Sequence, residues 1–112
     1  MRVMLIALAV AAGALGGAPT AGVEVRTFQF REQRLEIPAG ARVVWSNRDE
    51  IEHTVTSGVP DSADGAFAGR LAGKGSTFGH RFDRAGIYRY YCDRHHFMRG
   101  EIRVLPDTNG DH

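Results

Sequence analysis

Three side chains that bind soft metal ions lie within one segment of seven residues. Cys92, His95 and Met98 supply a thiolate, an imidazole and a thioether in the spacing CxxHxxM. One thiolate, two imidazoles and a weak axial thioether are the ligand set of copper sites that transfer electrons. The second imidazole must come from elsewhere in the chain, and His53 is the obvious supplier. The sequence therefore predicts one copper ion bound by these four residues.

The N-terminal region predicts export. A basic residue at position 2 precedes an apolar run over residues 3–12 and a stretch rich in Gly and Ala, which is the pattern of a secretory signal peptide. We expect residues 1–21 to be removed, with the cut between Gly16 and Gly22. The apolar run is shorter than the about 20 residues of a spanning helix. The mature protein is therefore expected to be periplasmic or secreted, without a stable membrane span.

Charge and cysteine content narrow the class of protein further. Removal of Arg2 would leave 13 basic and 13 acidic residues, so no nucleic-acid footprint is visible. The single cysteine, Cys92, has no partner for an internal disulfide in an oxidising compartment, and a bound metal would protect its thiol. Zinc also binds Cys and His, so a structural metal ion stays an alternative to copper.

The pattern from Val23 onward predicts an all-β sandwich. Short alternating runs are broken by turn residues at close intervals, and no helix is indicated. We expect about seven or eight strands in one domain over residues 22–106, followed by a polar tail over 107–112. Residues 57–75 are rich in Gly and are expected to form a long irregular loop. The predicted core comprises Val25, Phe30, Ile37, Val43, Trp45, Phe78, Phe82, Tyr88, Ile102 and Val104.

Three segments of the chain resemble the plastocyanin-like cupredoxins, the small blue copper proteins. They are NRDEIEHTV from Asn47, FGHRFDRAGIYRYYC from Phe78 and CDRHHFMRGEIRV from Cys92. The short gap between His95 and Met98 resembles that of the amicyanins. The resemblance implies a Greek-key sandwich that binds one type 1 copper and carries single electrons between protein partners, with no catalysis of its own. Delivery of copper through the same ligands is the alternative function.

The resemblance also implies supporting roles around the ligands. Asn47 would tie the two ligand loops together, and the Thr54 amide would donate to the Cys92 sulfur. Tyr88 would be a corner tyrosine that braces the strand leading to the cysteine. Amicyanins typically carry proline where this chain has Arg94, whose amide could give the sulfur a second hydrogen bond and raise the reduction potential.

Other residues near the predicted ligands have expected roles outside the ligand set. His96 does not fit the spacing of the family and is expected to be exposed. The acidic run Asp49, Glu50 and Glu52 is expected to be a solvated turn, and His80 to pack within a strand. Transient redox partners would dock on the monomer around His95, on a face made of Phe97, Val59, Phe67, His96 and Arg99.

Overall fold

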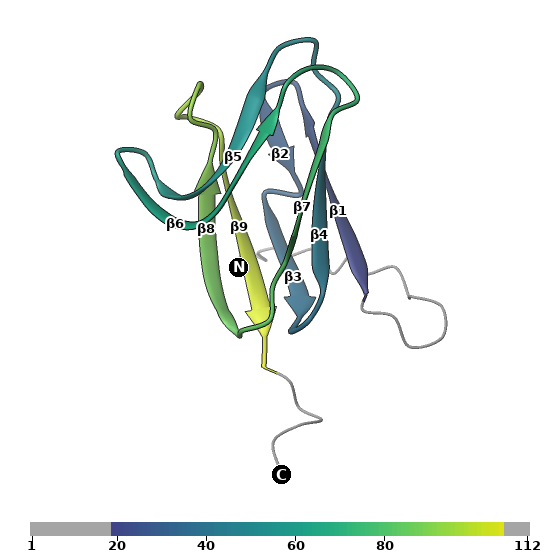
Figure 1. Ribbon diagram of the computed structural model, residues 1–112, viewed down its shortest axis with the longest axis vertical. Helices are drawn as coiled ribbons and strands as arrows, with labels where there is room; N and C mark the ends of the chain where they lie inside the picture. The colour runs from purple at the N-terminus through teal and green to yellow at the C-terminus, as the bar shows by residue number, and fades with distance from the viewer. Residues whose placement is uncertain (1–18, 107–112) are drawn as a thin grey trace, which may run out of the picture.

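The computed structural model describes residues 19–106, which form two packed β-sheets (Figure 1). One sheet has the strand order β2-β1-β4-β7 and the other has the order β3-β9-β8-β5-β6. The strands are β1 (Thr20–Arg26), β2 (Gln29–Arg31), β3 (Arg34–Pro38), β4 (Arg42–Asn47), β5 (His53–Val59), β6 (Ser62–Leu71), β7 (Thr77–Arg81), β8 (Gly86–Tyr91) and β9 (Arg99–Leu105). The predicted sandwich is confirmed, with nine strands in place of seven or eight.

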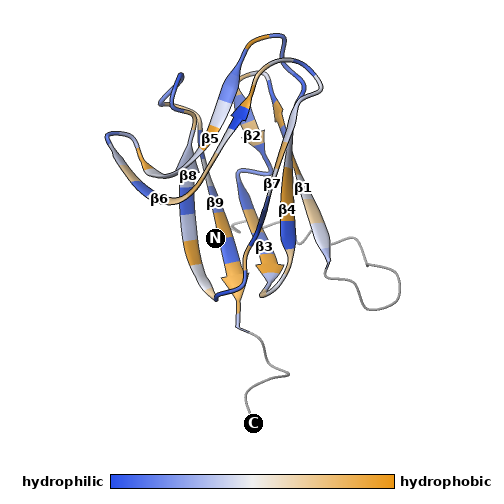
Figure 2. Ribbon diagram, viewed as in Figure 1, coloured by the Kyte–Doolittle hydropathy of each residue, from blue (hydrophilic) through white to orange (hydrophobic). Residues whose placement is uncertain are grey.

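Alternation of apolar and polar residues explains why these segments are strands. In β3, β4 and β9 every second residue is buried between the sheets, and the hydropathy colours alternate along β3 and β9 (Figure 2). Trp45 of β4 is fully buried and stacks on Phe67 and Phe78, while the ring of Tyr90 meets it edge-on. The predicted core is buried except for Phe78 and Tyr88, which are partly buried against it.

The segment expected to be a long irregular loop is mostly a β-hairpin, so that prediction is wrong. Strand β5 continues to Val59, and the ten-residue strand β6 returns antiparallel to it. Pro60 and Asp61 form the turn, in which Asp61 has a φ of 69°. Proline followed by a residue of positive φ suits a type II turn. The glycines suggested an irregular loop, but Gly58 lies at a break in the pairing register and Gly69 lies within β6.

The connections place the predicted ligands at one end of the sandwich. The turn between β1 and β2, the loop between β4 and β5, and the loop between β8 and β9 lie at the upper end in Figure 1. Tyr88 donates its hydroxyl hydrogen bond to the Arg84 carbonyl at 2.7 Å, which confirms the corner tyrosine. This bond braces the start of β8, the strand that leads to Cys92.

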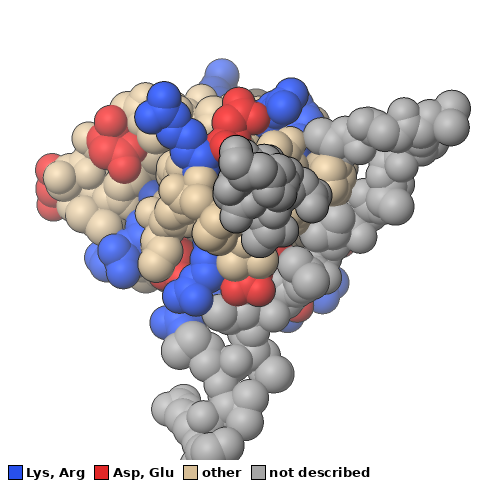
Figure 3. All heavy atoms as spheres, turned by 90° about the horizontal axis from the view of Figure 1, so that it is seen from below, with Lys and Arg blue, Asp and Glu red and all other residues tan. Residues whose placement is uncertain are grey.

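The surface carries charges of both signs. Seen from the lower end, acidic and basic side chains are interspersed over the visible surface (Figure 3). No helix among residues 19–106 is long and apolar enough to cross a membrane. The first strand begins at Thr20, two residues before the expected start of the domain. Most of the predicted signal segment and the whole predicted tail, 107–112, lie outside the described residues.

Gly69 provides a test of how closely the two sheets pack. It pairs with Val55 in the β5–β6 hairpin, and a Cβ atom added to it would overlap the Phe78 ring of the other sheet. Overpacking of this kind costs about 1–3 kcal/mol, so Gly69→Ala should lower the free energy of unfolding by that amount. Urea denaturation followed by Trp45 fluorescence measures it. Gly73→Ala is the control, since no atom lies within 4 Å of its added Cβ, and equal midpoints for both variants would contradict the prediction.

Candidate metal centre

The fold brings together two histidines and a cysteine that are separated in sequence. The metal-binding atoms of His53, Cys92 and His95 all lie within 4.8 Å of one another. His53 is the first residue of β5, and Cys92 follows β8 directly. Both are fully buried, whereas His95 is only partly buried. Three of the four predicted ligands therefore converge where the two loops meet.

Their spacing fits a single metal ion. The Sγ atom of Cys92 lies 3.7 Å from Nδ1 of His53 and 3.7 Å from Nδ1 of His95. With metal–nitrogen bonds of about 2.0 Å and a metal–sulfur bond of about 2.3 Å, a trigonal ion separates nitrogen from sulfur by about 3.7 Å. One thiolate and two imidazoles are the donor set of an electron-transfer copper site.

Met98 closes the loop that carries the other two ligands. It is buried, and its carbonyl accepts a hydrogen bond from the Cys92 amide at 3.0 Å. The amide of His95 donates to the Cys92 carbonyl, and the amide of Met98 donates to the His95 carbonyl. These three bonds fold residues 92–98 into a compact loop that places the thioether next to the thiolate and the imidazoles. Its position suits the weak axial ligand.

A carboxylate that was expected to be solvated sets the orientation of His53. Asp49 has a side chain only 13% exposed, and its Oδ2 lies 2.8 Å from Nε2 of His53. Burial opposes ionisation of Asp49, but hydrogen bonds from the Phe28 amide, His53 and the Thr27 amide outweigh it and lower its pKa. The carboxylate therefore favours the tautomer with hydrogen on Nε2, which leaves Nδ1 free to bind metal.

The state of His95 is also suited to metal binding. Burial of the ring lowers the pKa of His95, and the neighbouring His53 and Arg94 lower it further. A metal ion binds the neutral imidazole, so a lowered pKa reduces the competition from protons.

Thr54 connects the strand of His53 to the loop of Cys92. Its backbone amide donates to the Cys92 sulfur at 3.4 Å, as predicted. Its side-chain Oγ1 accepts a second bond from the Asp93 amide at 2.7 Å. One residue next to a ligand thus holds both the sulfur and the backbone that follows it.

Asn47 supports the site in a different way from the one predicted. Its amide nitrogen donates to the carbonyls of Ile51 and Leu71, and its Oδ1 accepts from the Asp49 amide. The described bonds of its side chain thus hold the loop before His53 and the end of β6. They do not reach the loop of residues 92–98, which Thr54 secures instead.

Comparisons with known proteins agree with this geometry. Residues 18–105 match the model of the copper binding proteins of the plastocyanin/azurin family. The chain belongs to this family. Amicyanin-alpha of Methylorubrum extorquens is 31% identical over 101 residues, which cover 86% of this chain and 85% of the relative. Plastocyanin of Scenedesmus fuscus is 29% identical over 91 residues, covering 74% and 93%.

Solved structures show the same fold. A purple cupredoxin from Nitrosopumilus maritimus has a TM-score of 0.70 and 26% sequence identity, over 76% of this chain and 99% of that chain. A structure of a reduced amicyanin variant has a TM-score of 0.68 and 27% identity, over 82% of this chain and 86% of that one. The cofactor of this cupredoxin is therefore copper, as the donor set indicates.

The hydrogen bond expected from Arg94 to the sulfur is not formed among the described residues. Thr54 supplies the one backbone amide that contacts Sγ of Cys92. The turn closed by the His95 amide on the Cys92 carbonyl directs the Asp93 amide to Thr54. The expected rise in reduction potential therefore has no support from a second N–H···S bond.

The apolar surface around His95 differs from the predicted one. Phe97 is 70% exposed and lies there as expected, with its ring centroid 6.2 Å from that of His95. Phe67 is buried in the core against Trp45, so its assignment to the docking face is wrong. Val59 is exposed and is the last residue of β5, the strand that His53 begins. It borders a second hollow lined by Gly58, Arg89 and Arg99, and Arg99 also lines the groove beside Phe97.

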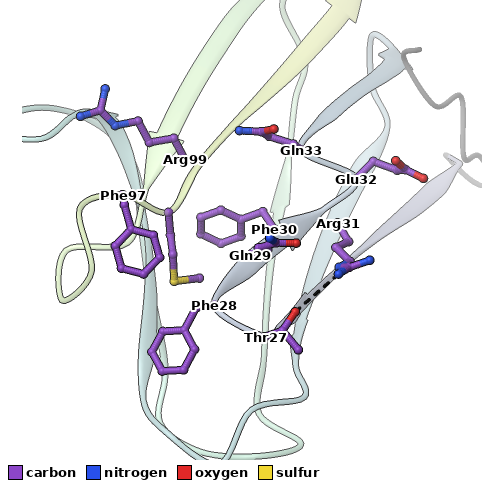
Figure 4. Close-up of a pocket in the computed structure, with 10 residues that line it drawn as sticks. Thr27, Phe28, Gln29, Phe30, Arg31, Glu32, Gln33, Phe97 and Arg99 are labelled. Carbon is purple, nitrogen blue, oxygen red and sulfur yellow. Dashed lines mark hydrogen bonds between the residues drawn. The ribbon is translucent and has the colours of Figure 1, made fainter. Parts of the chain in front are cut away.

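Phe28 occupies the position beside His95 that was predicted for Phe67. Its ring centroid is 4.9 Å from that of His95, and the ring stacks with Phe97 at 6.4 Å. Phe28 and Phe97 line one side of a groove of about 490 Å³ that extends past Met98 (Figure 4). Arg31 and Arg99 lie at its edges. A bulky residue in a two-residue turn, without Asn or Gly, is the sequence signal that could have pointed to Phe28.

The hydroxyl of Thr54 offers a direct test of how the two loops are joined. Thr54→Val removes the acceptor of the Asp93 amide but keeps the amide that contacts the sulfur. We expect copper affinity to fall by about 10–100-fold, the usual effect of losing a group that orients a ligand. Competition with a Cu(I) chelator measures it. Thr54→Ser keeps the hydroxyl and should bind nearly as tightly as wild type. Equal affinity for the Val variant would show that other contacts hold the loop.

Proposed function

We propose that this cupredoxin carries single electrons between redox proteins. The observation that supports this most directly is the preformed cluster of two nitrogens and one sulfur, in which each nitrogen lies 3.7 Å from the sulfur. Copper bound there alternates between Cu(I) and Cu(II). Ligands held by β5 and by a hydrogen-bonded loop need little movement when the charge of the metal changes, and this favours fast electron transfer.

His95 provides the path to the surface. It is the only one of the three clustered ligands that is not fully buried, and the rings of Phe28 and Phe97 flank it. We infer that partners dock on this apolar face through small, transient interfaces, below about 1,200 Å². His96 is exposed beside it, and Asp93 lies 3.8 Å from its ring.

Charge around this face favours acidic partners. Among the described residues, Glu50 pairs with Lys74 and Glu52 pairs with Arg70, which reduces the negative field on the side of His53. Arg94 and Arg99 are exposed, and within residues 19–106 neither forms an ion pair with a carboxylate. Arg94 also contributes to the lowered pKa of Glu52. Complementary charge would raise the rate of encounter more than the affinity.

Export and domain boundaries belong to the same proposal. We infer that an N-terminal leader directs the protein to the periplasm or outside the cell, where it acts as a monomer. Ala21 is a core residue, and β1 begins at Thr20. Cleavage before Thr20, within the predicted window of residues 16–22, would therefore leave the first strand complete.

The first test of the copper site is colour. Cu(II) added to the purified protein should give an intense blue absorption from charge transfer between the thiolate and copper, and Cys92→Ser should abolish it. His95→Ala should also lose the blue band. His96→Ala is the matched control and should keep it, because His95 rather than His96 lies 3.7 Å from the sulfur. A colourless wild-type protein would refute the proposed role as an electron carrier.

Copper delivery would use the same ligands as electron transfer. The two functions are distinguished by comparing the rate of electron self-exchange with the rate of copper release. NMR line broadening in mixtures of oxidised and reduced protein measures electron self-exchange. Mixing the Cu(I) form with copper-free Cys92→Ser protein and a Cu(I) chelator measures release of the ion. An electron carrier should exchange electrons many times before it loses one ion. Release faster than self-exchange would favour delivery.

A further inference from the structure

The turn between β1 and β2 has a backbone conformation that its residues do not favour. Thr27 and Phe28 have φ of 51° and 58°, both in the left-handed region. Two-residue hairpin turns of this kind normally carry Asn or Gly, and bulky or β-branched residues there are strained. The turn therefore needs support from outside the hairpin.

Asp49 supplies that support from the loop before β5. Its Oδ1 accepts a hydrogen bond from the Thr27 amide at 2.7 Å, and its Oδ2 accepts one from the Phe28 amide at 3.0 Å. The same Oδ2 lies 2.8 Å from Nε2 of His53. Glu50 next to it is 85% exposed and pairs with Lys74. The carboxylate of Asp49 thus joins the strained turn to a copper ligand.

The strained turn places the Phe28 ring over both imidazoles of the site. The ring meets His53 edge-to-face with centroids 5.2 Å apart and His95 with centroids 4.9 Å apart, each at an interplanar angle of 87°. Its side facing solvent contributes to the 36% exposure of Phe28.

We propose that Asp49 is a positioning residue that orients His53 for copper and, through the Thr27–Phe28 turn, holds the Phe28 ring as a cover over the two ligand imidazoles. The cover limits access of water and small chelators to the metal–imidazole bonds. The negative carboxylate on His53 makes that imidazole a stronger donor, which favours Cu(II) and lowers the reduction potential. The inference rests on the proposed copper site, but its first test does not require copper.

The first experiment measures hydrogen exchange in the copper-free protein. In Asp49→Ala the amides of Thr27 and Phe28 should exchange about tenfold faster or more than in wild type, because their acceptor is gone. Asp49→Asn, which keeps the shape, should show a smaller increase and replaces the Ala variant if that one does not fold. Glu50→Gln removes a neighbouring charge and should leave both amides unchanged. Unchanged exchange in the Asp49 variants would overturn the role of Asp49 in the turn.

The second experiment measures loss of Cu(I) to an excess of chelator and the reduction potential. Phe28→Ala and Phe28→Gly should both release copper several-fold faster than wild type, because both lack the ring. Phe28→Gly should unfold at higher urea than Phe28→Ala, because Gly tolerates the positive φ. If the two variants release copper at the same rate but differ in stability, the faster release is due to the missing ring and not to a general loss of stability. Release that follows stability would overturn the cover.

The reduction potential tests whether Asp49 acts on His53 or has a purely structural role. Asp49→Asn should release copper faster and have a higher reduction potential than wild type, whereas Glu50→Gln should match wild type in both. A potential that does not change in Asp49→Asn would overturn the link to His53. If wild-type protein does not bind copper at all, the proposed function fails, while the exchange of the Thr27 and Phe28 amides still decides the role of Asp49.

Discussion

A thiolate can bind one metal ion together with two imidazoles only if the strand and the loop that carry these groups are fixed to each other. In this protein Thr54 makes that connection, with its amide on the Cys92 sulfur and its hydroxyl on the Asp93 amide. These two hydrogen bonds join residues that are 38 and 39 positions apart in sequence. Ligand distances, metal geometry and electron transfer all depend on them.

The rest of the fold limits the movement of the two segments that Thr54 joins, β5 and the loop of Cys92. β5, which begins with His53, lies between β8 and β6 in its sheet, and the core around Trp45 packs the two sheets together. The loop of Cys92 and Met98 is closed by its own backbone hydrogen bonds. Ligands anchored in this way keep one geometry in both oxidation states, which is the condition for a small reorganisation on electron transfer.

Much of this could be predicted from the sequence because the signals are local. The spacing of Cys92, His95 and Met98 and the alternation in strands such as β4 and β9 depend on neighbours along the chain. The β5–β6 hairpin was missed because its glycines suggest a loop, whereas pairing with β5 makes residues 62–71 a strand. Phe67 was placed at the surface because it lies in that expected loop, whereas as part of β6 it is buried against Trp45.

Asp49 and Phe28 were missed for a different reason, since their role exists only in three dimensions. An acid followed by Glu50 and Glu52 in a loop has the composition of a solvated turn, and those two neighbours do pair with exposed cations. Asp49 turns inward because it meets three donors: the Thr27 and Phe28 amides of a distant turn, and the His53 ring four residues further along the chain. Each of these groups requires a hydrogen-bond acceptor: the amides of the strained turn to stabilise its conformation, and the buried ligand imidazole to fix its orientation. One carboxylate meets both needs, so a substitution there should affect the surface turn and the copper ligand together.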